Sequence, residues 1–122
     1  MKTEIKVGGR MKLFSEDVAY FEADVNYTII HYYQGKNKIV ATTIGQIHER
    51  IGEECGFIRP NRGYLINLQF VDKYKLGELL LQNKLKVNIS RRRKKRLNNI
   101  VEKYFEQKIQ ITAYTMKKSM RY

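Results

Sequence analysis

The chain has 122 residues, enough for one domain with a buried core, and 43% of them are hydrophobic. Its 24 Lys and Arg residues outnumber its 12 Asp and Glu residues, and the resulting net charge of +12 indicates a polyanionic partner such as nucleic acid or an anionic membrane. One proline and eight glycines exclude a largely disordered chain, and the single cysteine, Cys55, excludes an intrachain disulfide.

Several functional classes are disfavoured by the same sequence. No segment approaches the ~20 apolar residues of a membrane span, and the N-terminus lacks the apolar core of a signal peptide. We therefore expect a cytoplasmic protein without a membrane partner. Cys55, His31 and His48 are too scattered for a metal or cysteine-protease site, and no glycine-rich phosphate loop is present. The sequence predicts no enzymatic activity, no metal and no cofactor.

The first part of the chain reads as short strands. Alternating apolar and polar residues indicate extended segments at 4–7 and 11–14, and strand-forming residues predict strands over 18–22, 27–33 and 38–42. A polar break at 23–26 separates the first two of these three strands. The turn at 34–37 predicts a hairpin between the last two.

A change of period then predicts a helix. Ile44, Ile47, Ile51 and Cys55 recur at steps of three and four, which gives the helix one apolar face. Thr43 suits the N-cap, with Gln46 at the spacing of a capping box, and Gly56 suits the helix end. Beyond it, residues 57–58 are expected to be extended and residues 61–63 to form a turn. Strand-like runs follow at 64–68, 70–74, 78–82 and 85–89, the last two as a second hairpin.

The basic segment from Arg91 to Arg96 opens a second predicted helix, with Ser90 as its N-cap. Cations at a helix N-terminus oppose the helix dipole, so a bound phosphate would relieve the repulsion there. The apolar residues of this helix follow the charges and can join a core, which favours nucleic acid over a membrane. The basic tail is ambiguous, since Ile109, Ile111 and Ala113 alternate with other residues while Lys117, Lys118 and Arg121 add charge.

Two other readings stay open on the residues alone. A basic RNA-binding or ribosome-associated protein could stack bases on Tyr27, Tyr32 and Tyr33. An interaction module could use its charge to contact an acidic protein. Arg62, in the turn at 61–63, could donate two hydrogen bonds to a guanine or be an ordinary surface arginine. Asn26 could pair with an adenine, and Tyr27 could stack on a base or reach a phosphate, but the residues alone favour a turn residue and a strand aromatic.

The order of four segments resembles the LytTR-type DNA-binding domain. These are VAYFEADVNYTIIH, a T-x-x-Q helix, FIRPNRGYLINLQFVDKY and LLLQNKLKVNISRRRKKRL, which together extend over roughly Ser15 to Val101. The resemblance implies a mainly β, elongated domain of small antiparallel sheets with short helices. It further implies a sequence-specific bacterial transcriptional regulator whose loops read the major grooves of direct repeats in double-stranded DNA.

The resemblance also assigns residues and boundaries. Residues 1–14 would be an N-terminal extended segment, 15–106 the DNA-binding domain and 107–122 a basic extension. Base reading falls to Asn26, Tyr27, Arg62 and Arg91. Contact with the DNA backbone, or support of the loops, falls to Arg59, Asn61, Ser90, Arg92, Arg93, Lys94 and Lys95.

The sequence departs from the family pattern in two ways. Asn61 stands where the family often has histidine. The chain is also too short to include the usual receiver domain, so we expect either a stand-alone regulator or part of a longer response regulator. A sensor kinase would be a partner of the longer protein, and a dimer on DNA is compatible with both.

Overall fold

A computed structural model describes residues 4–8, 11–51 and 56–119, with side chains up to residue 109. It contains three antiparallel sheets, α1 (Ile44–Ile51) and α2 (Arg91–Ser119). β1 (Glu4–Lys6) and β2 (Lys12–Phe14) form a two-stranded sheet. The five-stranded sheet has the order β5 (Asn37–Val40), β4 (Tyr27–Tyr32), β3 (Val18–Asp24), β7 (Tyr64–Asn67) and β6 (Phe57–Asn61). The three-stranded sheet has the order β10 (Lys86–Asn88), β9 (Glu78–Leu81) and β8 (Val71–Lys75).

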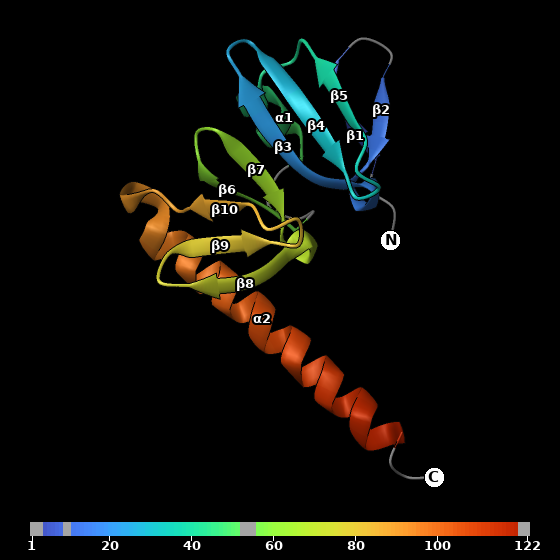
Figure 1. Ribbon diagram of the computed structural model, residues 1–122, viewed down its shortest axis with the longest axis vertical. Helices are drawn as coiled ribbons and strands as arrows, with labels where there is room; N and C mark the ends of the chain where they lie inside the picture. Colours follow the sequence, from blue (N-terminus) through green and yellow to red (C-terminus); the bar gives the residue numbers. More distant parts are fainter. Residues whose placement is uncertain (1–3, 9–10, 52–55, 120–122) are drawn as a thin grey trace.

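The five-stranded sheet separates two hydrophobic cores, because alternate residues of a strand point to opposite faces. Phe57 and Leu65 belong to the core shared with α1 and the β1–β2 hairpin. Their neighbours Ile58 and Ile66 belong to the core shared with the three-stranded sheet and α2. Figure 1 shows the resulting elongated molecule, with α2 running past the three-stranded sheet and projecting away from it. The predicted mainly β fold of small antiparallel sheets is confirmed.

A local signal accounts for the start of α1. In α1 the Gln46 N–H donates to Thr43 Oγ1 at 3.3 Å, and the Thr43 N–H donates to Gln46 Oε1 at 3.2 Å, which is the predicted capping box. Ser90 directly precedes α2, as expected. Cys55, predicted to end the apolar face of α1, lies outside the described residues. Gly56 has a left-handed φ of 76° at the start of the return to β6.

Most predicted strands are present with ends shifted by one or two residues. Residues Leu68–Phe70 form a short 3-10 turn, so the strand expected at 70–74 begins at Val71. The Asn67 side chain accepts the Gln69 N–H at 3.0 Å and donates to Val18 O at 3.0 Å, which fixes this turn against β3. The helix α2 continues without interruption past residue 106 and through most of the segment expected as a basic extension.

Candidate nucleic-acid interface

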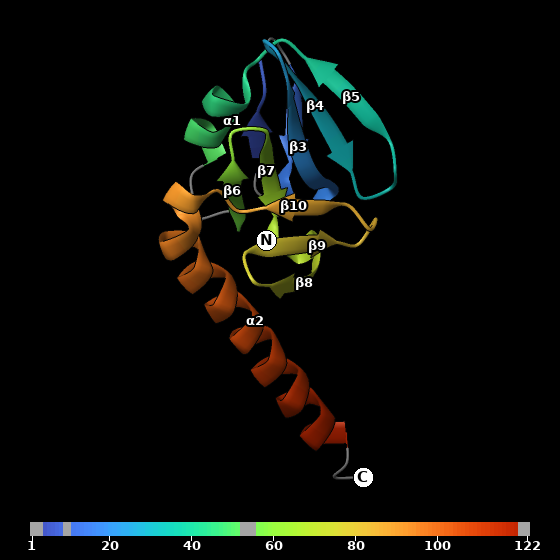
Figure 2. The same ribbon diagram turned by 60° about the vertical axis from the view of Figure 1, so that its left-hand side comes forward.

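Two hairpin turns and the beginning of α2 lie along one edge of the molecule. They are the β3–β4 turn at Val25–Asn26, the β6–β7 turn at Arg62–Gly63, and the first turn of α2. Figure 1 places all three at the left edge. In Figure 2, where that side is turned forward, the β6–β7 turn lies between the β3–β4 turn at the top and the start of α2 at the left. The Ala23 N–H donates to Gly63 O at 2.8 Å, which holds the two hairpins together. Predicted residues far apart in the sequence are thereby brought onto one surface.

Asn61 shapes the turn that carries Arg62. Its Oδ1 accepts the Gly63 N–H at 2.8 Å, closing the turn, and its Nδ2 donates to Asn88 O at 2.8 Å, joining the turn to β10. Both ends of the amide are therefore engaged within the protein. Arg62, which lies between Asn61 and Gly63, has an exposed side chain that takes no part in these hydrogen bonds.

The first turn of α2 is fixed to the same hairpin. The Ser90 N–H donates to Pro60 O at 2.9 Å, and the Arg93 N–H donates to Ser90 O at 3.0 Å. The first turn contains no acidic residue, so the basic segment meets the positive end of the helix dipole without local compensation. An anion at this position would be stabilised by the helix and the side chains together.

Arg59 on β6 connects the turn and the helix. Its guanidinium donates to Arg62 O at 3.2 Å, while its buried Nε has no hydrogen-bond partner. Burial and then the nearby charge of Arg93 lower the pKa of Arg59 from its ordinary value. Two like charges are thus held close together, an arrangement that a phosphate between or above them would stabilise.

The six cations of the basic segment do not share one face. Arg93 is half-buried beside Arg59, whereas Arg91, Arg92 and Lys95 are exposed. Lys94 lies across the β8–β9 turn, where a Cβ on Gly77 would come within 2.6 Å of its Cε. The basic run, which looks uniform in the sequence, is therefore divided between the Arg62 hairpin and the three-stranded sheet.

The remaining predicted base readers are exposed at the β3–β4 hairpin. Asn26 occupies the turn, and Tyr27 begins β4 with 53% of its surface accessible. The three tyrosines considered for RNA stacking do not form a platform. Tyr27 is at one end of β4, and Tyr33 just beyond the other end packs edge-on against Phe70 with ring centroids 5.2 Å apart.

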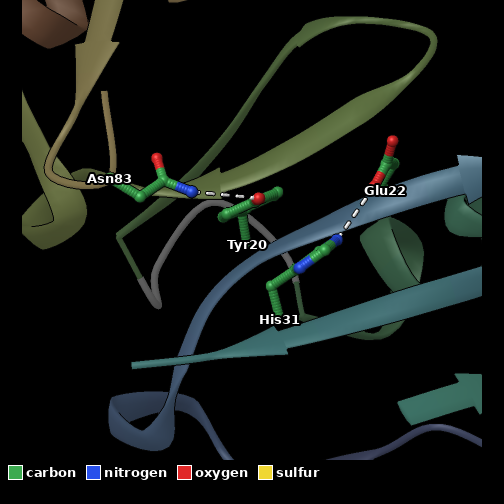
Figure 3. A network of polar contacts seen from close by, with 4 residues as sticks. All are labelled: Tyr20, Glu22, His31 and Asn83. Carbon is green, nitrogen blue, oxygen red and sulfur yellow. Dashed lines mark hydrogen bonds and ion pairs between the residues drawn. The ribbon is translucent and has the colours of Figure 1, made fainter. Parts of the chain in front are cut away.

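A polar network that the sequence did not suggest joins the two larger sheets. His31 Nε2 lies 2.8 Å from Glu22 Oε1, and the His31 ring stacks on Tyr20 with centroids 4.2 Å apart. Asn83, in the β9–β10 turn, donates to the Tyr20 hydroxyl at 3.2 Å. Figure 3 shows this chain of contacts passing from β3 and β4 toward the three-stranded sheet. It helps to fix the sheet that carries both hairpin turns relative to the sheet packed against α2.

Neither a metal site nor a membrane helix is found in the part of the chain that the structure describes. There is no group of three or more His, Cys, Asp or Glu side chains that could hold a metal ion. Of the helices described, none is both long enough and apolar enough to cross a bilayer.

Comparison with known proteins gives a family and a fold. The sequence profile of the LytTr DNA-binding domain matches residues 9–102. A solved structure described as the LytTr DNA-binding domain of a methyl-accepting/DNA response regulator from Bacillus cereus superposes with a TM-score of 0.54. It is 18% identical, and the match covers 87% of this chain and 94% of that one. No curated protein matches the sequence.

Proposed function

Because this chain belongs to the LytTR family of DNA-binding domains, which act in transcription regulation, we propose that it reads a specific duplex sequence. The reading surface would be the edge formed by the β3–β4 turn, the Arg62 turn and the start of α2. Two copies would bind direct repeats in a promoter, each placing its loops in neighbouring major grooves. The observation that supports this most directly is the joining of the Arg62 turn, the β3–β4 turn and the start of α2 into one surface.

The proposed roles follow from exposure and anchoring. Arg62 and Arg91 are exposed and can reach guanine O6 and N7, the commonest partner of a base-reading arginine. Asn26 and Tyr27 would read bases from the adjacent hairpin. Backbone contacts are assigned to the cations and to the residue at the helix start, namely Arg59, Ser90, Arg92, Arg93, Lys94 and Lys95.

Asn61 receives a positioning role in this proposal. Its amide is engaged by Gly63 and Asn88, so its effect on DNA would act through the geometry of the Arg62 turn. For a direct phosphate contact Asn61 has only its second Nδ2–H to offer, since the first donates to Asn88 O.

Site selection from random duplex DNA tests the proposal. We expect enrichment of two similar half-sites about one helical turn apart. On the enriched site, Arg62→Ala or Arg91→Ala should cost about 1–3 kcal/mol, with little change on random DNA. Lys38→Ala, which removes an exposed lysine of the edge strand β5, is the matched control for lost charge and should leave selectivity unchanged.

Salt dependence separates base reading from phosphate contact. Lys95→Ala should weaken binding to all duplexes alike and reduce the slope of log affinity against log salt by about 0.9. Failure to enrich any duplex motif, or equal losses on cognate and random DNA for both arginine variants, would contradict the proposal.

A further inference from the structure

Val25 occupies the tip of the β3–β4 hairpin in a conformation that its side chain disfavours. Its φ is 54°, in the left-handed region, and 89% of the residue is exposed. β-Branched residues are rare at positive φ because their two γ-branches crowd the backbone. Two-residue hairpin turns usually place glycine, asparagine or aspartate at such a position.

Packing in the described part of the domain does not offset the strain at Val25. The side chain is too exposed to contribute to either hydrophobic core, and the turn would form more readily with glycine or asparagine. Asparagine is in fact the next residue in the turn. Backbone strain of this kind is concentrated at functional sites, where the side chain serves a partner.

The position of Val25 indicates which partner. The Ala23 N–H, two residues before Val25, donates to Gly63 O in the Arg62 turn. On the other side Val25 adjoins Asn26 and Tyr27, both exposed on the same edge. Val25 is therefore an exposed apolar group at the tip of a hairpin, on a surface that is otherwise polar and cationic.

We propose that Val25 is a specificity-determining residue that contacts the C5-methyl group of a thymine in the major groove. That methyl is the apolar feature by which the major groove distinguishes thymine, and small apolar side chains contact it. This inference rests on the proposed function, since it requires the β3–β4 turn to enter the major groove. It adds an apolar contact to the hydrogen-bonding residues Arg62 and Arg91.

Replacement of single thymines by deoxyuridine tests the contact, because it removes the methyl group and keeps the base-pairing edge. On the site enriched from random duplex, we expect one thymine in each half-site whose replacement weakens binding by the full chain about fourfold. This factor corresponds to burial of one methyl-sized group. In Val25→Gly the same replacement should have no effect, because the apolar contact is already lost. In Val25→Thr, which keeps one of the two γ-methyl groups, the effect should be smaller than in the unmodified protein.

The two variants distinguish chemistry from folding. Val25→Gly relieves the strained φ, whereas Val25→Thr keeps the β-branched shape and exchanges a methyl for a hydroxyl. Ile39→Ala removes an exposed apolar side chain of β5 and should retain the full deoxyuridine effect. Circular dichroism confirms that each variant is folded.

The results separate this inference from the function on which it rests. If no thymine shows a deoxyuridine effect that depends on Val25, while Arg62→Ala still weakens binding to the enriched site more than to random DNA, the thymine contact is wrong and the DNA-reading function stands. If selection enriches no duplex site at all, the proposed function fails and the inference fails with it.

Discussion

Removal of the Asn61 amide should disturb stability and DNA recognition together. Asn61→Ala deletes the hydrogen bonds to the Gly63 N–H and to Asn88 O, both 2.8 Å long. Each such bond contributes about 0.5–1.5 kcal/mol net, so the variant should lose about 1–3 kcal/mol of unfolding free energy. For a domain of this size, each kcal/mol corresponds to a fall of about 3–5 °C in melting temperature.

A second variant separates the two hydrogen bonds. Asn61→Asp keeps an acceptor for Gly63 but places an oxygen opposite Asn88 O, so it should lose the bond to β10 and add a repulsion. Asn88→Ala is the matched control, because the bond uses the backbone carbonyl of Asn88 and survives the loss of its exposed side chain. It should therefore resemble the unmodified protein in both assays.

Urea denaturation and fluorescence anisotropy with the enriched duplex measure the two effects. In both Asn61 variants the loss of affinity should be larger on the enriched site than on random DNA, because the turn that carries Arg62 is no longer fixed. If Asn61→Ala were as stable as Asn88→Ala and bound DNA equally well, the positioning role would be refuted. If affinity fell equally on both duplexes with stability unchanged, Asn61 would instead contact phosphate.

Three further outcomes can be measured. Gly77→Ala should lower the free energy of unfolding by about 1–2 kcal/mol, because alanine disfavours the φ of 76° at this position and its Cβ would displace Lys94. Unchanged stability in urea denaturation would show that the β8–β9 turn rearranges freely. Val25→Gly should leave the melting temperature unchanged or higher, since relief of strain offsets the greater freedom of glycine in the unfolded chain, and a clear decrease would contradict the strain argument. Burial, with a smaller contribution from Tyr104, raises the pKa of Tyr33 to about 12 from the ordinary value of 10.0. Because the pKa of Tyr33 is higher in the folded protein than in the unfolded chain, Tyr33 contributes its full stabilisation below pH 10.0. This contribution is lost as the pH rises from there toward about 12. Tyr33→Phe should remove this part of the alkaline loss in denaturation curves and cost little at neutral pH, because the buried hydroxyl has no hydrogen-bond partner; an unchanged alkaline slope would assign that loss to other groups.

The fold was predictable from the sequence where periodicity is strong. Consecutive apolar residues in a strand, as in Phe57–Ile58 and Leu65–Ile66, point to opposite faces of the sheet. Such a run is a local signal that the sheet is buried on both faces. The capping residues Thr43 and Gln46 are equally local. The 3-10 turn at Leu68–Phe70 was missed although its cap is local, since Asn67 Oδ1 accepts the Gln69 N–H. The bond from Asn67 to Val18 O, which fixes the turn against β3, is far apart in the sequence and has no local signal.

The candidate interface was predictable only in part, because proximity between distant segments has no local signature. An anionic partner for Ser90–Arg96 was predicted from charge and helix position alone, while the prediction for Arg62 depended on family resemblance. Arg59 was predicted to contact the DNA backbone, but its closeness to Arg93 emerges only after β6 pairs with β7 and α2 is anchored at Pro60. The strain at Val25 was hidden because no residue pattern reports a positive φ at valine.

The continuity of α2 gives the molecule a fixed mechanical relation between its two ends. A straight α-helix of 29 residues extends about 43 Å, and each residue turns it by about 100°. Anything attached to its far end is therefore held at a set distance and rotational phase relative to the edge proposed to read DNA. Insertion of one residue beyond Tyr104 would advance such an attachment by only about 1.5 Å but swing it roughly a quarter turn around the helix axis. A change in the length of this helix would therefore alter the orientation of an attached group much more than its distance from that edge.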